Sequence, residues 1–483
     1  MLRKLWKSRS GNFAFVAAVA TVPLVLSIGM ATDYSRHVSA KRHLQEIADS
    51  VSLALATGSE RNSSKMVPTA QQYINANLSK SRIDEIDQIA AKDITIDGDS
   101  IDVVLSGHVK TTFMGIAGYR VLDVKASSLA VRSPNGNVEI ALVLDNTWSM
   151  SEADAKGVRK IDALKSAANE LIESLMGTGA AVKISLVPYA DYVNVGPENR
   201  NKPWVAVEPD IKAVAATCKK VDTTYSPCTT WTSKTCTTLV DGVPENWDCG
   251  SCTAYGPPVT VKQNQCSGGV SGQTWYGCVG SRTVGDLRLD DTSPLVPYPG
   301  YVGTWQNCLN PVVPLSASKP KLRNAVDAMI INRGSYKPNT YIPAGLVWGV
   351  NMLSPKAPFT EGAAYDPKNL KPRKAIVLMT DGENTLKFNP SNGRHYGFSS
   401  DAATAAKEFR TVNAETVRIC DYAKQNNIEI FSVAFMVDNS DARTMLQTCA
   451  SDPDHYFDAS DNERLTVAFG KISESLSLVR LAR

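Results

Sequence analysis

The hydrophobic pattern of the chain begins with an uncharged run of about 20 residues, from 13 to 32. The charged residues that precede this run are all basic: Arg3, Lys4, Lys7 and Arg9. A helix of this length spans a hydrocarbon core of about 30 Å, and basic residues stay on the cytoplasmic side of a membrane. We therefore expect a basic cytoplasmic tail over 1–12, a transmembrane helix over 13–32, and the remainder of the chain outside the cytoplasm.

Cleavage of a signal peptide is the alternative interpretation of this run. The segment Gly29-Met30-Ala31 would serve as a small-residue cleavage site. The helical pattern continues beyond the apolar run, however, and this continuation favours an uncleaved anchor. Its apolar positions recur at helical spacing: Leu44, Ile47, Ala48, Val51 and Leu55.

The pattern then changes to the alternation that is typical of a small sheet. Apolar residues alternate on both sides of the turn dipeptide Asp97-Gly98, which predicts a β-hairpin. These positions are Ile94, Ile96, Ile101, Val103 and Leu105. A cluster of turn residues at 133–136 marks a domain boundary. The sequence thus predicts a small α+β membrane-proximal module over 33–136.

Beyond this boundary, strands and helices alternate along the chain. Several segments read as nearly continuous apolar strands with helical stripes between and after them: 138–144, 182–187, 375–379 and 428–435. Strands of this kind belong to a mostly parallel sheet that helices cover on both faces. We therefore expect a doubly wound α/β domain over 137–483, with ligands bound beyond the carboxyl ends of its strands.

The cysteines are distributed unevenly. Eight of the ten lie between Cys218 and Cys308, and the other two are Cys420 and Cys449. An even count that clusters in one Thr- and Gly-rich stretch indicates disulfides, and therefore an oxidising compartment. This stretch interrupts the α/β domain over about 197–316 and is too long for a structureless loop. We expect a Cys-rich, disulfide-stapled subdomain there, of unknown connectivity.

The composition fits a globular protein and removes two classes of function. Hydrophobic residues make up 43% of the chain, the mean hydropathy is −0.16 and the formal net charge is +3. Neither a multi-span transporter nor a nucleic-acid binder is expected from these values. No phosphate-binding loop or serine-hydrolase elbow is present, so we expect neither a small-molecule substrate nor enzymatic activity.

Cys249 and Cys252 form a C-x-x-C motif, a spacing that also occurs in redox-active sites. Redox motifs of this type follow a strand and open a helix, a context that lowers the pKa of the first thiol. That context is missing here. Structural disulfides are the favoured interpretation, and redox activity or zinc binding are the alternatives.

Oxygen-bearing side chains follow two of the predicted strands. Asp145, Thr147 and Ser149 alternate in the loop after the first strand, and Asp381 follows a later strand. Thr340 lies just before a helix. Hydroxyls and carboxylates suit a hard divalent cation, most of all Mg²⁺, with Ca²⁺ or Mn²⁺ as alternatives. The other reading of the two aspartates is that they only cap their loops.

These segments resemble the metal-ion-dependent adhesion site of von Willebrand factor type A domains, over about 137–200 and 317–483. The resemblance implies metal contacts, direct or through water, from three hydroxyls: those of Thr147, Ser149 and Thr340. Asp145 and Asp381 would mostly hold metal-bound waters. It also implies an open coordination position, which accepts a carboxylate from a partner protein. Trp148 stands where the family often has glycine, and we expect it at the rim of the site.

The N-terminal segment shows a second resemblance. Arg9-Ser10-Gly11-Asn12-Phe13-Ala14, the apolar run, and Asp33-Tyr34-Ser35-Arg36 are similar to the TadG-like N-terminal module of Flp (tight-adherence) pilus-assembly proteins. Members of that family continue as an Ala-rich helix and combine this anchor with a von Willebrand factor type A domain. Cys420 and Cys449 match a late pair of cysteines that recurs in the family.

Together, the two resemblances imply a single-pass protein of the bacterial inner membrane with most of its mass in the periplasm. Such a protein would bind a divalent cation and dock an acidic side chain of a partner during assembly or anchoring of Flp pili. Two alternatives stay open. One is a surface-exposed or secreted adhesin that binds a host or matrix ligand through the same site. The other is an enzyme, either a metal-dependent hydrolase or an oxidoreductase that uses Cys249 and Cys252.

Overall fold

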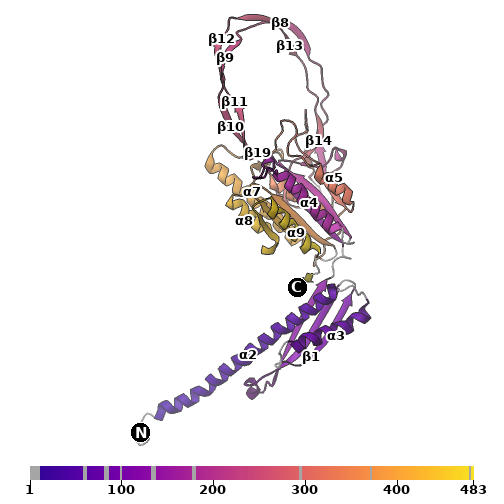
Figure 1. Ribbon diagram of the computed structural model, residues 1–483, viewed down its shortest axis with the longest axis vertical. Coiled ribbons are helices and arrows are strands. Elements are labelled where there is room, and N and C mark those ends of the chain that lie inside the picture. Colours follow the sequence, from indigo (N-terminus) through magenta and orange to yellow (C-terminus); the bar gives the residue numbers. More distant parts are fainter. Residues whose placement is uncertain are drawn as a thin grey trace. The chain divides into compact units, whose positions relative to one another are not determined.

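The computed structural model describes residues 11–57, 62–80, 86–97, 100–131, 137–176, 181–292, 296–369, 372–477 and 480–482. The chain divides into two compact units (Figure 1), and each is described by itself. The smaller unit comprises Met1–Asn135 and Leu478–Arg483, and the larger unit is Gly136–Ser477. Residues 1–10 of the predicted cytoplasmic tail lie outside the described residues.

The smaller unit is an antiparallel sheet with helices packed on it. Its elements are α2 (Gly11–Thr57), α3 (Ser63–Lys80), β1 (Ile86–Asp97), β2 (Ser100–Lys110), the 3-10 helix η1 (Met114–Ala117), β3 (Val121–Val131) and β22 (Arg480–Ala482). The strand order is β1-β2-β3-β22. The predicted hairpin is confirmed, since Ile94 pairs with Val103 and Ile96 with Ile101. The pattern assigns all of 137–483 to the α/β domain, but β22 pairs with β3 instead.

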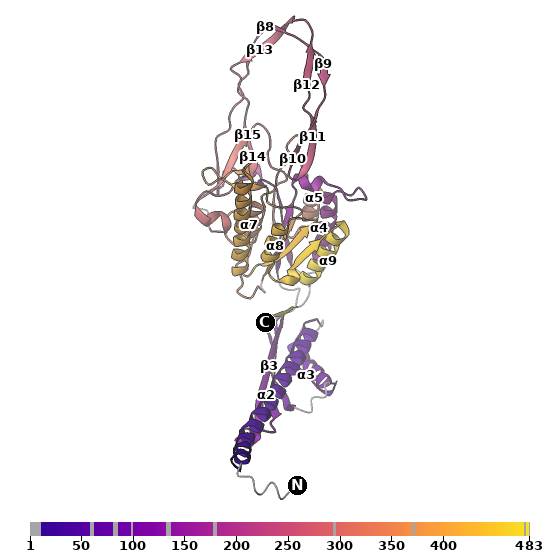
Figure 2. The ribbon, with the colours of Figure 1, turned by 90° about the vertical axis from the view of Figure 1, so that its left-hand side faces the viewer.

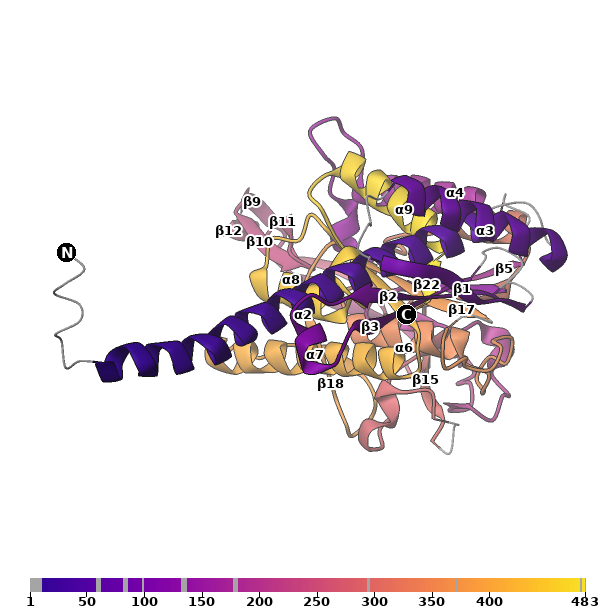
Figure 3. The same ribbon diagram turned by 90° about the horizontal axis from the view of Figure 1, so that it is seen from below.

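The long helix α2 unites the apolar run and its predicted continuation. The positions predicted to face a core are buried against the sheet and α3: Leu44, Ile47, Ala48, Val51 and Leu55. The N-terminal part of α2 extends beyond the sheet (Figure 3). Among the described residues, no helix is both long and apolar enough to cross a membrane. The transmembrane helix predicted over 13–32 is therefore not confirmed.

Asp33 on α2 holds the segment that leads into η1. Its carboxylate accepts hydrogen bonds from the backbone N–H groups of Thr112, Phe113 and Met114, over 2.7 to 3.1 Å. One turn earlier, a Cβ atom on Gly29 would lie 2.3 Å from the Phe113 ring, so a side chain there would displace this segment. The short polar motif that follows the apolar run therefore has a local structural role.

We expect Asp33→Ala to cost about 1–3 kcal/mol of local stability, because it leaves partly buried N–H groups without their acceptor. Hydrogen exchange of the amides of 112–114 measures this loss and should become roughly 5- to 150-fold faster. Ser35→Ala, at an exposed position of the same helix, is the matched control. Equal exchange in both variants would show that Asp33 does not hold this segment.

The larger unit is built on a six-stranded sheet of order β16-β5-β4-β17-β20-β21. All neighbouring strands are parallel except β16 and β5. The strands are β4 (Val138–Asp145), β5 (Val182–Tyr189), β16 (Val313–Ser316), β17 (Arg373–Thr380), β20 (Glu429–Phe435) and β21 (Tyr456–Ala459). The helices are α4 (Lys160–Met176), α5 (Lys319–Asp327), α6 (Ile342–Leu353), α7 (Ala402–Gln425), α8 (Ser440–Cys449) and α9 (Asn462–Ser477).

Helices cover both faces of this sheet, so the predicted doubly wound α/β architecture is confirmed. Helices α4, α5 and α9 pack on one face and α6, α7 and α8 on the other (Figure 2). Alternate residues of β4 enter the two cores, Ala141 and Val143 on one side and Leu142 and Leu144 on the other. Burial on both faces explains why these strands read as continuous apolar runs.

Glu139 is a charged residue within the otherwise apolar part of β4 that precedes Asp145, and Lys374 on the adjacent strand β17 pairs with it. Lys374 Nζ donates to Glu139 Oε2 over 2.7 Å, and both side chains are 1% exposed. The same ammonium also donates to the carbonyl oxygens of Leu353 and Ala363. A fully hydrogen-bonded buried pair of this kind is tolerated, whereas one partner left alone is costly.

Lys374→Met should lower the free energy of unfolding by about 3–5 kcal/mol, because it leaves the buried Glu139 carboxylate unpaired. Chemical denaturation of the full chain, followed by tryptophan fluorescence, measures this change. Lys183→Met is the control, since the Lys183 ammonium lies 3.9 Å from Glu139 and is 45% exposed. That control should lose less than about 1 kcal/mol. A comparable loss in the two variants would contradict the special cost of the buried pair.

The insertion predicted over 197–316 is stapled by disulfides, as expected, and its central part is an extended ribbon. Residues 217–267 form a two-stranded ribbon, which we call the arm: β8 (Thr217–Tyr225) pairs with β13 (Val259–Ser267), β9 (Cys228–Thr232) with β12 (Ser251–Tyr255), and β10 (Thr235–Val240) with β11 (Val243–Asp248). The arm arches over, so that the β10–β11 hairpin returns to the domain (Figures 1 and 2). Its side chains are too exposed to form a core.

The remaining parts of the insertion pack on the domain. Strands β6 (Val193–Asn194), β7 (Val205–Val207), β14 (Thr274–Val279) and β15 (Tyr298–Gly303) form a second sheet at the base of the arm. The insertion also contains the 3-10 helices η3 (Pro197–Asn199) and η4 (Gly285–Leu289). Elsewhere, the larger unit contains the 3-10 helix η5 (Pro453–His455) and a hairpin formed by β18 (Leu386–Phe388) and β19 (His395–Gly397).

Disulfides take the place of a core in the arm. Three of them cross the ribbon: Cys218–Cys266, Cys228–Cys252 and Cys236–Cys249. Outside the arm, Cys278–Cys308 lies at its base, and Cys420–Cys449 joins α7 to α8. The two cysteines of the C-x-x-C motif therefore pair with different partners rather than with each other.

We expect all ten cysteines to resist alkylation in the native, non-reduced protein, because each belongs to a disulfide. Mass spectrometry after proteolysis should recover the peptide of Cys249 linked to that of Cys236, and the peptide of Cys252 linked to that of Cys228. A direct link between Cys249 and Cys252, or their prompt alkylation, would contradict this connectivity and favour a redox motif.

Candidate metal site

The five side chains predicted to bind a metal meet at the carboxyl edge of the main sheet. Asp145 ends β4 and Asp381 directly follows β17. Thr340 lies shortly before α6, and Thr147 and Ser149 belong to the tight turn around the 3-10 helix η2 (Trp148–Ser151). Because β4 and β17 are neighbouring parallel strands, their ends place the two aspartates together.

Hydrogen bonds link four of these five residues directly. The backbone N–H of Thr147 donates to Asp145 Oδ1 over 2.9 Å, and the hydroxyl oxygens of Thr147 and Ser149 lie 3.0 Å apart. Ser149 Oγ donates to Asp381 Oδ1 over 2.7 Å. Asp145 is held further by Thr380 Oγ1, which donates to its Oδ2 over 2.8 Å.

A sixth oxygen-bearing side chain, Asp241, completes the cluster and connects Thr340 to it. Asp241 Oδ1 accepts a hydrogen bond from Thr340 Oγ1 over 2.8 Å, and its Oδ2 accepts one from the backbone N–H of Ser149 over 3.0 Å. The residue sits at the tip of the arm, in the turn between β10 and β11. Its φ of 50° lies in the left-handed region, as a tight Asp-Gly hairpin turn requires.

Sequence reasoning missed Asp241, although one signal was present. The dipeptide Asp241-Gly242, flanked by alternating segments, is a strong hairpin signal. It identifies the turn, but it gives no information about where the tip of the arm docks. Lys160 was also missed, because no motif distinguishes a functional lysine at the start of a helix.

The cluster is buried, in contrast to the open coordination position that the resemblance implies. Thr340 is 1% exposed, Asp381 4% and Ser149 9%. The arm provides the cover, since Asp241 contacts both Ser149 and Thr340. The open rim expected from the resemblance is therefore closed in this structure by the chain itself.

The cluster brings ionisable carboxyl groups together in a buried site. Burial raises the pKa of Asp145 to about 8, and the nearby carboxylates of Asp381 and Asp241 add to this effect. Burial also raises the pKa of Asp381, even though the ammonium of Lys160 lies beside it. Lys160 Nζ donates to Asp381 Oδ2 over 3.0 Å and to Glu152 Oε2 over 2.7 Å. Burial alone would lower the pKa of Lys160, but these two carboxylates raise it overall.

The residues of the cluster fit a hard cation. Carboxylate and hydroxyl oxygens are the donors that Mg²⁺ and Ca²⁺ prefer, and the three carboxyl groups of the cluster outnumber the single ammonium of Lys160. Within the described ranges, His, Cys, Asp and Glu side chains alone form no group of three or more that could hold a metal ion. A cation in this cluster would therefore depend on the hydroxyls of Thr147, Ser149 and Thr340.

Trp148 lies at the rim of the cluster, and its contact is the arm. Its indole Nε1 donates to Glu245 Oε1 over 2.9 Å. Lys337 Nζ lies 2.7 Å from the same carboxylate oxygen and 4.2 Å above the centre of the Trp148 ring. The aromatic residue in the place of glycine therefore helps to hold the arm on the domain.

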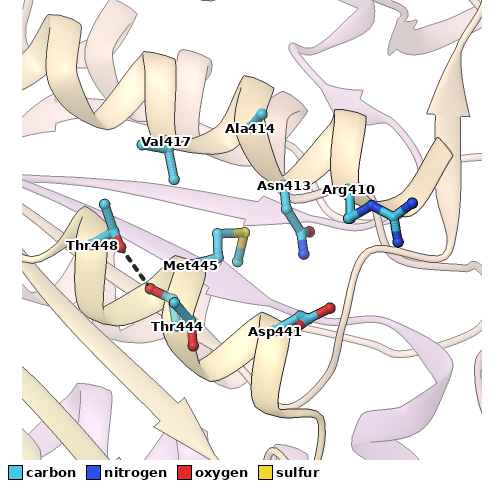
Figure 4. Close-up of a pocket in the computed structure, with 8 residues that line it drawn as sticks. All are labelled: Arg410, Asn413, Ala414, Val417, Asp441, Thr444, Met445 and Thr448. Atoms are coloured by element: carbon cyan, nitrogen blue, oxygen red, sulfur yellow. Dashed lines mark hydrogen bonds between the residues drawn. The ribbon is translucent and has the colours of Figure 1, made fainter. Parts of the chain in front are cut away.

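A groove of about 270 Å³ between α7 and α8 is separate from this cluster (Figure 4). Val417 and Met445 lie along it, and Arg410 and Asp441 lie toward one end. None of the predicted metal ligands lines this groove. The groove therefore gives no alternative location for the predicted site.

Comparison with known families identifies two segments of the chain. Residues 11–57 match the family model described as Flp pilus-assembly TadE/G-like, and residues 306–471 match the von Willebrand factor type A domain. The resemblance to these two families is thus confirmed over these residues, and the segment with Asp145, Thr147 and Ser149 lies outside both matches. A search of curated proteins finds no match.

Several solved structures are similar to this chain at low identity. The pilus adhesin SpaC of Lactobacillus rhamnosus GG is 14% identical, with a TM-score of 0.35, over 81% of this chain and 34% of its own length. The pilus adhesin RrgA of Streptococcus pneumoniae is 10% identical, with a TM-score of 0.38, over 81% of this chain and 49% of its own. BatB of Bacteroides thetaiotaomicron is 10% identical, with a TM-score of 0.28, over 70% of this chain and 98% of its own. The chain spans about a third of the length of SpaC.

Proposed function

Because the chain combines a TadE/G-like segment with a von Willebrand factor type A domain, we propose that it docks a protein partner during assembly or anchoring of Flp pili. The docking site is the buried cluster, which binds a divalent cation, Mg²⁺ first and Ca²⁺ or Mn²⁺ as alternatives. The ligands are Asp145, Thr147, Ser149, Thr340 and Asp381. The cation attracts an acidic side chain of the partner, which is another pilus-assembly or envelope protein.

One observation carries this proposal: oxygen donors from three separate segments converge in a buried cluster that is rich in carboxyl groups. Loop-capping aspartates would each bond to their own loop. Asp381 instead accepts from Ser149, 232 residues away in the sequence. Such a long-range arrangement of buried carboxylates is costly to fold unless a positive charge offsets it. Lys160 supplies part of that charge, and a bound cation would supply the rest.

The proposed location is the bacterial inner membrane, with the N-terminus in the cytoplasm and the bulk of the chain in the periplasm. The TadE/G-like segment indicates a cell-envelope protein. The N-terminal part of α2 exposes apolar side chains that a lipid phase would cover: Val19, Leu24, Val25, Ile28 and Met30. Five disulfides favour an oxidising compartment such as the periplasm.

The proposed role is binding rather than catalysis. The cation positions one carboxylate of the partner, and the surrounding contacts set specificity. A surface adhesin would use the same site, and it differs from the proposed protein in location and in ligand.

The cation requirement can be tested by thermal unfolding of the detergent-solubilised full chain in EDTA and in excess Mg²⁺. At a concentration 100 times the dissociation constant, Mg²⁺ should stabilise the wild type by about 2.7 kcal/mol. Asp145→Ala combined with Asp381→Ala should remove this stabilisation and leave a folded domain, because both groups lie at loop ends outside the apolar cores.

Asp441→Ala is the control for this experiment, since it removes an exposed carboxylate outside the cluster. Its response to Mg²⁺ should equal that of the wild type. If the wild type unfolds identically in EDTA and in Mg²⁺, the metal claim fails.

A further inference from the structure

The arm contains one buried residue. The structure describes every residue between Val205 and Trp275, and within this interval Asp241 alone is buried, at 6% exposure. The other side chains of the interval are exposed or half-exposed, and disulfides rather than a core stabilise the ribbon. An arm without a core that buries a single carboxylate is therefore anchored at its tip.

The carboxylate of Asp241 lies among the predicted cation ligands. It accepts from the N–H of Ser149 and from the hydroxyl of Thr340, which belong to two of the three segments that form the cluster. A longer contact of 3.4 Å joins it to Thr385 Oγ1. A partner's carboxylate would have to reach this same point to share a cation with Ser149 and Thr340.

Contacts beside Asp241 orient the tip. The backbone N–H of Asp241 donates to Asn339 Oδ1 over 3.2 Å, next to Thr340. Glu245, on the following strand of the hairpin, bonds to Trp148 and Lys337. The tip is therefore held on both sides of the carboxylate, by residues that directly adjoin the predicted ligands.

The carboxyl groups that meet at the docked tip repel one another when they are ionised, and a cation would relieve this repulsion. The docked tip adds a third carboxylate to a buried cluster that already contains Asp145 and Asp381. Without a cation, the ammonium of Lys160, which contacts Asp381, and the neutral donors around Asp241 must offset the repulsion among these groups, and burial in a low-dielectric site strengthens that repulsion. With a cation, the same carboxylate becomes a ligand, and its docking is favoured.

We propose that the tip of the arm is an internal ligand of the cation site, in which Asp241 supplies the carboxylate that a partner would otherwise supply. This inference rests on the proposed function. The cation fastens the arm to the domain, and an acidic partner competes with Asp241 for the same coordination position. The arm thereby keeps the site closed until a partner displaces it.

Hydrogen exchange of the full chain in EDTA and in Mg²⁺ tests this proposal. In the wild type, Mg²⁺ should slow exchange at the tip amides of 239–245 and at Ser149, whose N–H donates to Asp241, by at least about tenfold. Asp241→Asn should abolish this slowing. It should also weaken Mg²⁺ binding, measured by calorimetry, by at least about tenfold, which is the lower end of the effect known for residues that support metal ligands.

Asp222→Asn is the matched control, because it makes the same change at an exposed position of the same arm. It should behave as the wild type in both measurements. The comparison of EDTA with Mg²⁺ in the wild type needs no variant, so it decides the question even if Asp241→Asn does not fold.

Two results would overturn the inference in distinguishable ways. If Mg²⁺ binds and slows exchange over 145–151, but leaves the amides of 239–245 unchanged, the proposed function stands and the internal ligand is refuted. If Mg²⁺ produces neither heat nor any change in exchange, the proposed cation site fails and the inference fails with it.

Discussion

The burial of three carboxyl groups at the carboxyl edge of the sheet is the constraint on which the larger unit depends. The ends of β4 and β17 bring Asp145 and Asp381 together, and the arm adds Asp241. A site that excludes water cannot hold such charge without compensation. Lys160 compensates in part, through its contact with Asp381. Backbone N–H groups and hydroxyls orient the oxygens, and the proposed cation site rests on these features together.

The sheet that carries the cluster is tightly packed, whereas the arm that covers the cluster is largely exposed. The buried pair of Glu139 and Lys374 and the two apolar cores fix the sheet from which the ligand loops emerge. The arm, in contrast, has no core and touches the cluster through its tip. Disulfides stabilise the shape of the ribbon itself. Its tip is attached to the domain by a small number of contacts. These properties suit the proposed role of the arm, which covers the site until a partner displaces it.

Much of the site follows from the sequence because strand ends are predictable. The apolar runs that end near Asp145 and Asp381 identify β4 and β17, and parallel strands place their carboxyl ends at one edge. Asp241 could not be derived in the same way, since the position of a hairpin tip depends on the whole path of the arm. The disulfides expected over 197–316 are present, but the ribbon shape of the arm could not be derived, for a related reason. Cysteine spacing indicates disulfides, but it does not show whether they staple a core or a ribbon.

The fold of the smaller unit shows a similar limit. Helical spacing predicted the buried face of α2, and the alternation around Asp97-Gly98 predicted the hairpin. The three residues of β22 carry no periodic signal, so their pairing with β3 could not be anticipated. Short elements and long-range contacts depend on tertiary packing, whereas the longer periodic elements are specified locally.

The central claim is that the oxygen atoms of this cluster bind one hard cation, and anomalous diffraction from crystals grown with Mn²⁺ tests it most directly. The account predicts a single anomalous peak among Ser149, Thr340 and Asp241, within about 2.0–2.3 Å of at least one of their oxygens. A cluster without a peak, or manganese bound only elsewhere on the chain, would contradict it.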